Sequence, residues 1–219
     1  MAERILIHNA ACILPDGIGP AGQVLIETEG ARIASIRPAG KHDAVPHELD
    51  ARGGFVVPGF IDIHCHGGDG HDFMDGTVTA FRAIAQVHAQ HGTTLIAPTT
   101  VACSLDELKD LFGLLRQVQA QGTGGAELAG IHLEGPYLAP VMKGAQPESA
   151  IRLPDRREVQ AILEIGRGLI SRWSAAPELP GSRDFARMVT AAGIPLSIAH
   201  SEATCEQVLE AYQWGFHSV

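Results

Sequence analysis

The sequence predicts an α/β protein in which parallel strands are covered by helices, with a smaller β-rich segment before them. After residue 57, short apolar runs alternate with stretches of helical periodicity, which is the pattern of strand-helix units. Before residue 57, the apolar runs are short and separated by turn residues. Three later apolar runs each end in a residue that can bind a metal, namely His66, Glu134 and His200. These observations divide the chain into residues 1–56 and residues 57–219.

The first segment is predicted to be a small β unit. Strand-like runs at residues 5–7, 23–27 and 33–36 are separated by turn-forming residues at 15–17 and 29–30 and followed by others at 38–40. No residue of this segment is a catalytic candidate. We expect it to pack before the α/β part of the chain.

Helical periodicity marks the second segment. Helices are predicted at residues 79–91, from 104 to about 115, at 155–165, at 183–192 and from 205 to near 214. Ser104 is the expected N-cap of the second helix, with Glu107 as its capping-box partner. His88 and His91 lie on the first helix, which covers the outside of the strands, so we expect structural roles for both.

The apolar run that begins at residue 57 ends at His64, Cys65 and His66, before two glycines. Alternate residues of a strand share a face, with Cα atoms roughly 7 Å apart, so both imidazoles are expected to project together. Such a pair can bind a divalent metal and leave positions open for water and substrate. A His-x-His triplet alone is a weak signal, because histidine is common at half-buried positions. Asp62 is expected on the same face, either near the metal or fixing the loop.

Two later strands end in the same manner. Residues 128–134 form a short strand that places Glu134 before Gly135 and Pro136, and residues 194–199 form a strand that delivers His200. The carboxyl ends of parallel strands carry the chemistry in α/β folds. A carboxylate at Glu134 can therefore ligate or bridge metals that His64 and His66 also approach.

Composition excludes several classes of protein. A hydrophobic content of 45% and a charged content of 19% describe a globular chain rather than a disordered one. The net charge of −9 argues against a nucleic-acid surface, which needs clustered lysine and arginine. The 4 cysteines are scattered, no export signal precedes them, and no apolar run is long enough to cross a membrane. We therefore expect reduced thiols and a cytoplasmic location.

Three motifs resemble one family. Residues 58–68 resemble the first barrel strand of the amidohydrolase superfamily, and residues 132–136 and 199–204 resemble N-acetylglucosamine-6-phosphate deacetylases within it. The resemblance implies a (β/α)8 TIM-type barrel for residues 57–219 and part of a β-sandwich for residues 1–56. It also implies hydrolysis of the acetamide of N-acetylglucosamine 6-phosphate to glucosamine 6-phosphate and acetate, in a homodimer when the protein is full length.

The same resemblance assigns roles at the site. Glu134 and His200 are the expected metal ligands, and His64 and His66 are expected to hold a second ion, although whether one or two ions bind stays open. Imidazole and carboxylate ligands suit zinc or iron, with manganese also possible. The resemblance makes Ala145 and Gln146 part of a segment that wraps over the sugar. Gln146 cannot titrate near neutral pH, which excludes a proton relay at that position.

Other parts of the family pattern lie outside residues 1–219. The sixth-strand histidine ligand has no counterpart, because His217 is out of register with it. The eighth-strand aspartate, which is the general base and acid of the family, and the phosphate-binding residues are expected beyond Val219. About five and a half of eight strands are present. We therefore expect a fragment or split gene product that is inactive alone.

Two other functions are kept open. The first is another amidohydrolase, which acts on a cyclic or linear amide. A cyclic-amide hydrolase commonly uses a carbamylated lysine as bridging ligand, which the Glu134 motif argues against. A truncated remnant without catalysis, which only binds a partner, is the second possibility.

Overall fold

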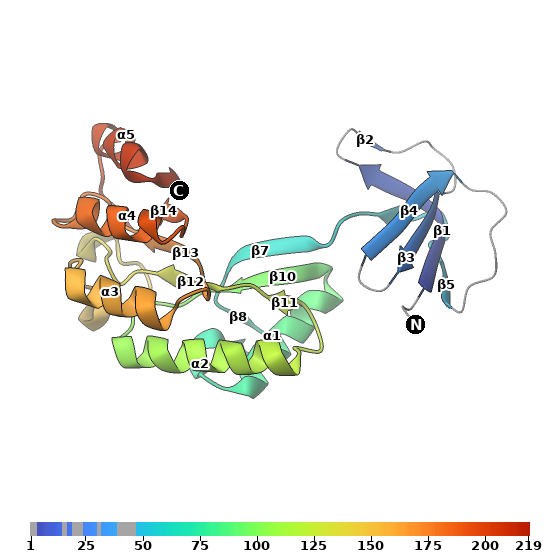
Figure 1. Ribbon diagram of the computed structural model, residues 1–219, viewed down its shortest axis with the longest axis horizontal. Helices are drawn as coiled ribbons and strands as arrows, with labels where there is room; N and C mark the ends of the chain where they lie inside the picture. The colour runs from blue at the N-terminus through green and yellow to red at the C-terminus, as the bar shows by residue number, and fades with distance from the viewer. Residues whose placement is uncertain (1–3, 15–16, 19–23, 30–31, 39–46) are drawn as a thin grey trace. The chain divides into compact units, whose positions relative to one another are not determined.

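The computed structural model describes residues 4–14, 17–18, 24–29, 32–38 and 47–219. These residues form two compact units, Met1–Gly59 and Phe60–Val219 (Figure 1). Residues 15–16, 30 and 39–40 of the predicted turns, and the first residue of the strand predicted at 23–27, lie outside the described residues.

The first unit is a mixed sheet built around one long strand. Its strands are β1 (Arg4–Leu14), β2 (Gly17–Ile18), β3 (Val24–Glu29), β4 (Arg32–Pro38), β5 (His47–Asp50) and β6 (Phe55–Val56). The order is β2-β1-β3-β4 with antiparallel pairs, while β5 and β6 pair with β1 in parallel. Leu6, Ala10, Cys12 and Ile26 are its buried apolar side chains among the described residues.

The second unit alternates strands with helices, which confirms the predicted α/β class. Its strands are β7 (Phe60–Cys65), β8 (Gly67–Gly68), β9 (His71–Asp72), β10 (Thr93–Pro98), β11 (Glu127–Leu128), β12 (Ile131–Glu134), β13 (Ile170–Ala175), β14 (Leu196–Ile198) and β15 (Phe216–Ser218). Its α-helices are α1 (Val78–Gln90), α2 (Leu105–Gln121), α3 (Arg156–Ile165), α4 (Ser182–Ala191) and α5 (Cys205–Trp214).

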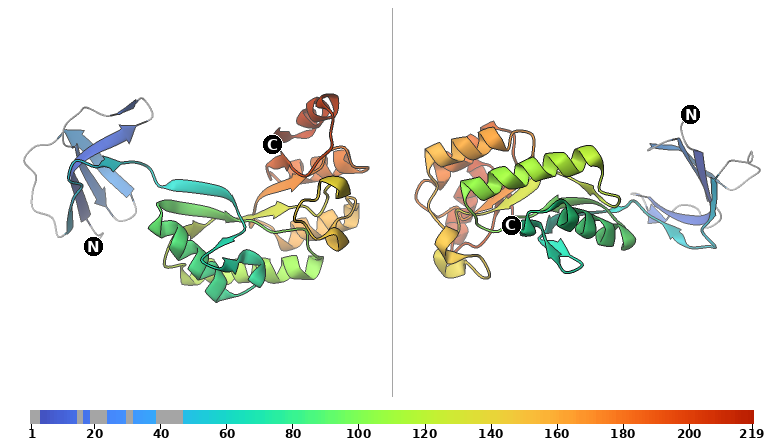
Figure 2. Two further views of the ribbon diagram at one scale, coloured as in Figure 1. Left: turned by 180° about the vertical axis from the view of Figure 1, so that it is seen from behind. Right: turned by 90° about the horizontal axis from the view of Figure 1, so that it is seen from below.

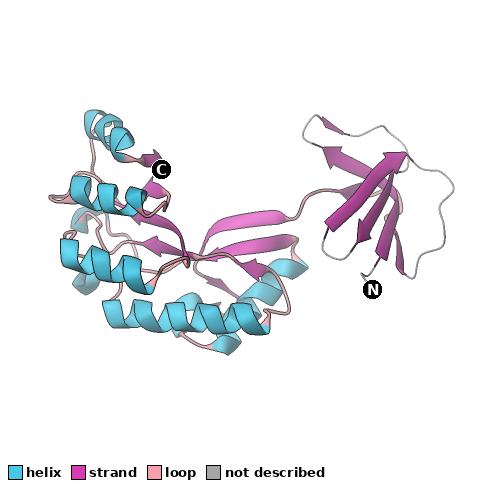
Figure 3. Cartoon of the chain, viewed as in Figure 1, coloured by secondary structure: helices cyan, strands magenta, loops and turns pink. Residues whose placement is uncertain are grey.

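All strands of the two main sheets run parallel. One sheet has the order β11-β10-β7 and the other the order β12-β13-β14-β15, and a single bridge between Thr99 and His132 joins them. Successive helices from α1 to α5 contact one another and cover one side of the strands (Figures 2 and 3). Because the strands are parallel, their carboxyl ends point the same way and can share one site.

Local capping explains where the helices begin. Ser104 accepts a hydrogen bond from the Glu107 amide while the Glu107 carboxylate accepts from the Ser104 amide, which confirms the predicted capping box. Thr204 and Gln207 form the same arrangement at α5. These short-range contacts satisfy amide groups that have no partner inside the helix.

The core lies between the strands and the helices. Phe112 on α2 is fully buried. Tyr137 stacks on Trp173, and Phe185 packs edge-on against both rings, with all three centroids 5.0 to 5.8 Å apart. The indole N–H of Trp173 donates to the carbonyl of Gly135 at 2.8 Å, so this large side chain leaves no polar atom unpaired. The core therefore fixes the chain at the point where β12 ends.

A long connection from residue 135 to residue 155 follows β12. It contains two short 3-10 turns, Pro140–Met142 and Glu148–Ala150. Arg152 donates to both carboxylate oxygens of Glu158, at 2.7 to 3.1 Å, and to the carbonyl of Cys103 at 3.0 Å. Tyr137, Leu138 and Ala139 bury the start of the connection, and the pair of Arg152 and Glu158 holds its end. The Tyr137 hydroxyl donates to the Glu158 carboxylate as well.

We expect Phe112→Ala to lower the free energy of unfolding by about 3–5 kcal/mol, because it leaves a cavity in a packed core. Phe60→Ala is the matched control, since Phe60 is 62% exposed whereas Phe112 is 0% exposed. The control is expected to change stability by about 0.5 kcal/mol or less. Urea unfolding of the two variants measures the difference, and equal losses would contradict the packing described above.

Candidate metal centre

The ends of β7 and β12 bring two imidazoles against one carboxylate. The Nε2 atoms of His64 and His66 lie 3.3 Å apart. His64 Nε2 lies 3.4 Å from Glu134 Oε1, and His66 Nε2 lies 3.1 Å from Glu134 Oε2. The predicted convergence of these three side chains is therefore present in the structure.

The strand that carries the two histidines is irregular at its end. Its pairing with β10 shifts between Ile96 and Pro98, so the expectation that Asp62 and His64 share a face is wrong. Asp62 instead groups with Cys65 and His88, toward α1. One Asp62 oxygen accepts the backbone N–H of His64 at 3.1 Å, which is the loop-fixing role kept open from the sequence.

Glu134 is the most enclosed member of the site, with only 4% of its surface exposed. Its Oε2 accepts a hydrogen bond of 2.7 Å from Nε2 of Gln146, whose own Oε1 accepts the backbone N–H of Ala102 at 2.7 Å. The second hydrogen bond identifies which end of the Gln146 amide carries the NH2 group. Gln146 therefore fixes the orientation of the carboxylate.

His200 approaches the same carboxylate from β14. Its Nε2 lies 3.2 Å from Glu134 Oε1, and its Nδ1 lies 2.8 Å from the carbonyl oxygen of Met142. A carbonyl oxygen only accepts, so Nδ1 carries the hydrogen and, in the neutral ring, Nε2 offers a lone pair. This is the tautomer that a metal-ligating histidine needs.

Backbone geometry places the His200 side chain. The residue lies two positions after the end of β14 and has a φ of 48°, in the left-handed region. The carboxylate of Glu178 holds the following turn by accepting from the Ser201 hydroxyl and the Glu202 amide, each at 2.7 Å. These contacts show that Glu178 organises the loop after His200.

Electrostatics keep Glu134 ionised. Burial alone would raise its pKa, but the hydrogen bond from His66 and the charges of His64 and His66 lower the pKa to about 2. The hydrogen bond to Glu134 raises the pKa of His66, whereas burial lowers the pKa of His64. The site therefore presents an anionic carboxylate at neutral pH.

The spacing of the donor atoms fits a divalent metal. Two ligands of a tetrahedral zinc ion, each about 2.0–2.1 Å from it, are separated by roughly 3.3 Å. The separations of His64 Nε2, His66 Nε2 and His200 Nε2 from their Glu134 oxygens are 3.4, 3.1 and 3.2 Å. A set of imidazoles and one carboxylate suits zinc, iron or manganese. The donor set is thus compatible with the predicted cation.

Two further polar residues, His132 and Arg172, lie beside the candidate ligands. Nδ1 of buried His132 accepts from Arg172 at 3.3 Å, so its Nε2 donates to the Ser174 hydroxyl at 2.7 Å. Burial lowers the pKa of His132 to about 3, which keeps the ring neutral where it packs 4.7 Å from the ring of His64. Arg172 also donates to the carbonyl of Ile63 at 3.2 Å. Sequence reasoning missed Arg172, although a charged residue inside an apolar strand is a usable signal.

The remaining predicted residues lie in different settings. Ala145 is exposed on the connection beside buried Gln146. His217 lies on β15 and packs against the ring of Tyr212, with centroids 4.9 Å apart. His91 contacts the Val87 carbonyl at the end of α1, in the structural role predicted for it.

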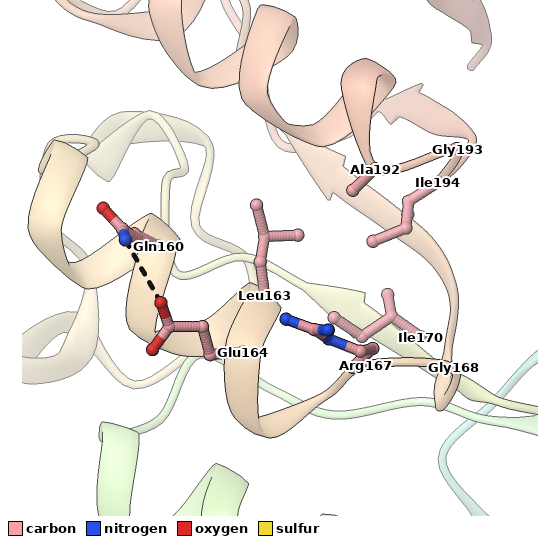
Figure 4. Close-up of a pocket in the computed structure, with 9 residues that line it drawn as sticks. All are labelled: Gln160, Leu163, Glu164, Arg167, Gly168, Ile170, Ala192, Gly193 and Ile194. Atoms are coloured by element: carbon pink, nitrogen blue, oxygen red, sulfur yellow. Dashed lines mark hydrogen bonds between the residues drawn. The ribbon is translucent and has the colours of Figure 1, made fainter.

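A hollow of about 520 Å³ lies elsewhere on the second unit, between α3, the start of β13 and the end of α4 (Figure 4). Its lining includes the hydrogen-bonded pair Gln160 and Glu164 and the apolar side chains of Leu163, Ile170 and Ile194. It adjoins the amino ends of β13 and β14, whereas Glu134 and His200 lie at the carboxyl ends of strands. The hollow therefore takes no part in the candidate metal centre.

Within the part of the chain that the structure describes, no helix is both long and apolar enough to cross a membrane.

The chain is similar to several known proteins. The N-acetylglucosamine-6-phosphate deacetylase of Bacillus subtilis (strain 168) is 30% identical over 219 residues, covering 98% of this chain and 55% of the relative. The N-acetylgalactosamine-6-phosphate deacetylase of Escherichia coli O157:H7 is 30% identical over 168 residues, covering 77% of this chain and 44% of the relative. The crystal structure of N-acetyl-D-glucosamine-6-phosphate deacetylase from Mycobacterium smegmatis is similar with a TM-score of 0.83 at 28% identity, covering 98% and 58% of the two chains.

The chain thus spans about half the length of the curated relatives it matches. Residues 55–218, which are most of the chain, match the family model described as "Amidohydrolase family". By this match the chain belongs to the amidohydrolase family.

Proposed function

We propose that this chain supplies the metal-binding part of an enzyme that hydrolyses the acetamide of N-acetylglucosamine 6-phosphate to glucosamine 6-phosphate and acetate. The observation that carries the proposal is the convergence of His64, His66 and His200 on buried Glu134, each at the end of a parallel strand. Relatives named for this deacetylation match the chain at about 30% identity.

The proposed architecture is the first five to six strands of a (β/α)8 barrel, after part of a β-sandwich. The two parallel sheets follow each other in chain order and are linked by the bridge from Thr99 to His132. In such a barrel, catalytic groups gather at the carboxyl ends of the strands, where the four candidate ligands lie. The domain limits remain those predicted, at residues 1–56 and 57–219.

The chain's own residues would hold the metal and orient it. Glu134 stays anionic, Gln146 fixes one of its oxygens, and the Met142 carbonyl fixes the tautomer of His200. A divalent metal bound there supplies an acidified water and a polarised amide carbonyl. The resemblance assigns the proton transfer from water to the leaving amine to an eighth-strand aspartate, which is not among residues 1–219.

Several finer points belong to the same proposal. Zinc or iron is the proposed metal, with manganese possible, and one or two ions would bind through His64, His66, Glu134 and His200. Ala145 and Gln146 are proposed to line the sugar site. The working enzyme is proposed to be a cytoplasmic homodimer. A second candidate substrate is N-acetylgalactosamine 6-phosphate, because one relative at 30% identity is named for it.

We expect Glu134→Gln to weaken zinc binding by more than about 100-fold, since loss of an outer partner alone typically weakens binding 10–100-fold. The amide has the same shape as the carboxylate but lacks its charge. Glu202→Gln is the matched control, because Glu202 is exposed and its side chain does not contact the site. Competition with a chelator measures both affinities, and equal affinities would show that Glu134 is not a ligand.

The activity is tested by acetate release from N-acetylglucosamine 6-phosphate, using the natural polypeptide that contains residues 1–219. We expect metal-dependent turnover that falls at least about 100-fold in Glu134→Gln. Faster hydrolysis of a cyclic amide, or unchanged turnover in Glu134→Gln, would overturn the proposal. The galactosamine epimer, assayed in parallel, decides between the two sugars.

A further inference from the structure

A second group of metal-binding side chains lies on the side of β7 that faces α1. It consists of Asp62 and Cys65 from β7 and His88 from α1. One ligand atom from each of the three lies within 4.8 Å of the others. The group shares no residue with the centre around Glu134. Cys65 is buried, while Asp62 and His88 are half-buried.

The distance between sulfur and nitrogen fits a shared metal ion. Cys65 Sγ lies 3.3 Å from His88 Nε2. A tetrahedral zinc ion with a thiolate at about 2.3 Å and an imidazole at about 2.0–2.1 Å separates these atoms by roughly 3.5 Å. Only a small adjustment of the two side chains is needed. Asp62 then supplies a third ligand and leaves the fourth position to water.

The backbone around the group is already fixed. The amide of Cys65 donates to the Thr99 hydroxyl at 3.0 Å, and Asp62 uses one carboxylate oxygen for the His64 amide. Gly68 leaves the room that the imidazole occupies, because a Cβ there would lie 3.3 Å from His88 Nε2. The three donors are therefore held close together before any ion binds, which lowers the entropic cost of binding.

We propose that Asp62, Cys65 and His88 form a zinc site separate from the centre at Glu134. The thiol loses its proton to solvent as the zinc–sulfur bond forms, and the resulting thiolate and carboxylate balance the charge of the ion. A thiolate ligand favours zinc over magnesium, calcium and manganese. Because Cys65 lies between His64 and His66, an ion at this site would also restrain the segment that carries those two histidines.

Cobalt(II) is a suitable probe, because a thiolate ligand gives it an intense near-ultraviolet charge-transfer absorption that imidazole and carboxylate ligands do not give. We expect titration of the 219-residue chain with cobalt(II) to produce this absorption and excess zinc to remove it. Cys65→Ser is expected to abolish it, whereas Cys205→Ser, which changes an exposed thiol, is expected to retain it. Glu134→Gln is also expected to retain it, because that residue belongs to the other centre.

His88→Gln provides a second test that leaves the thiol in place. We expect it to lower the cobalt affinity, measured from the thiolate absorption, at least tenfold. His91→Gln, which changes the residue after the end of the same helix, is expected to leave that affinity unchanged. Circular dichroism verifies that each variant is folded. The proposal is overturned if the unchanged chain shows no thiolate absorption, if Cys65→Ser keeps it, or if the two histidine variants behave alike.

Discussion

The buried carboxylate of Glu134 is the feature on which the second unit depends. A charge that is 4% exposed destabilises a fold by several kcal/mol unless partners surround it. Here His66 and Gln146 contact one oxygen and His64 and His200 contact the other. These partners come from β7, from the connection after β12 and from the end of β14. One charge therefore sets the positions of three separate segments.

Hydrogen bonds around the site hold the segments that carry these partners of Glu134. Asp62 holds the irregular end of β7, and Glu178 holds the turn after His200. Arg172 links β13 to the Ile63 carbonyl and keeps His132 in one tautomer. The contacts of Asp62 and Glu178 lie near the ends of β7 and β14, where the regular ladder of hydrogen bonds stops. Their combined effect is to hold the donor atoms at the spacing that a metal requires.

The elements that depend on local patterns were predictable from the sequence. The helix expected at residues 79–91 is α1 (Val78–Gln90), and the capping box at Ser104 is present, because both depend on neighbouring residues. The meeting of strand ends was also predictable, since parallel strands direct their carboxyl ends to one side. The side of β7 on which Asp62 lies could not be predicted from the sequence, because the irregular pairing with β10 breaks the alternation of faces. The contact between Gln146 and Glu134 could not be predicted either, because it depends on how the whole connection at residues 135–155 folds.

The most direct test of the role of Glu134 is an anomalous difference map, measured at the zinc edge, from crystals of the chain grown with zinc. We expect a peak about 2.0–2.2 Å from a Glu134 oxygen and at bonding distance from at least one of His64, His66 and His200. A map with no peak at Glu134, in crystals that contain zinc elsewhere, would contradict the assignment of this carboxylate as the anchor of the metal centre.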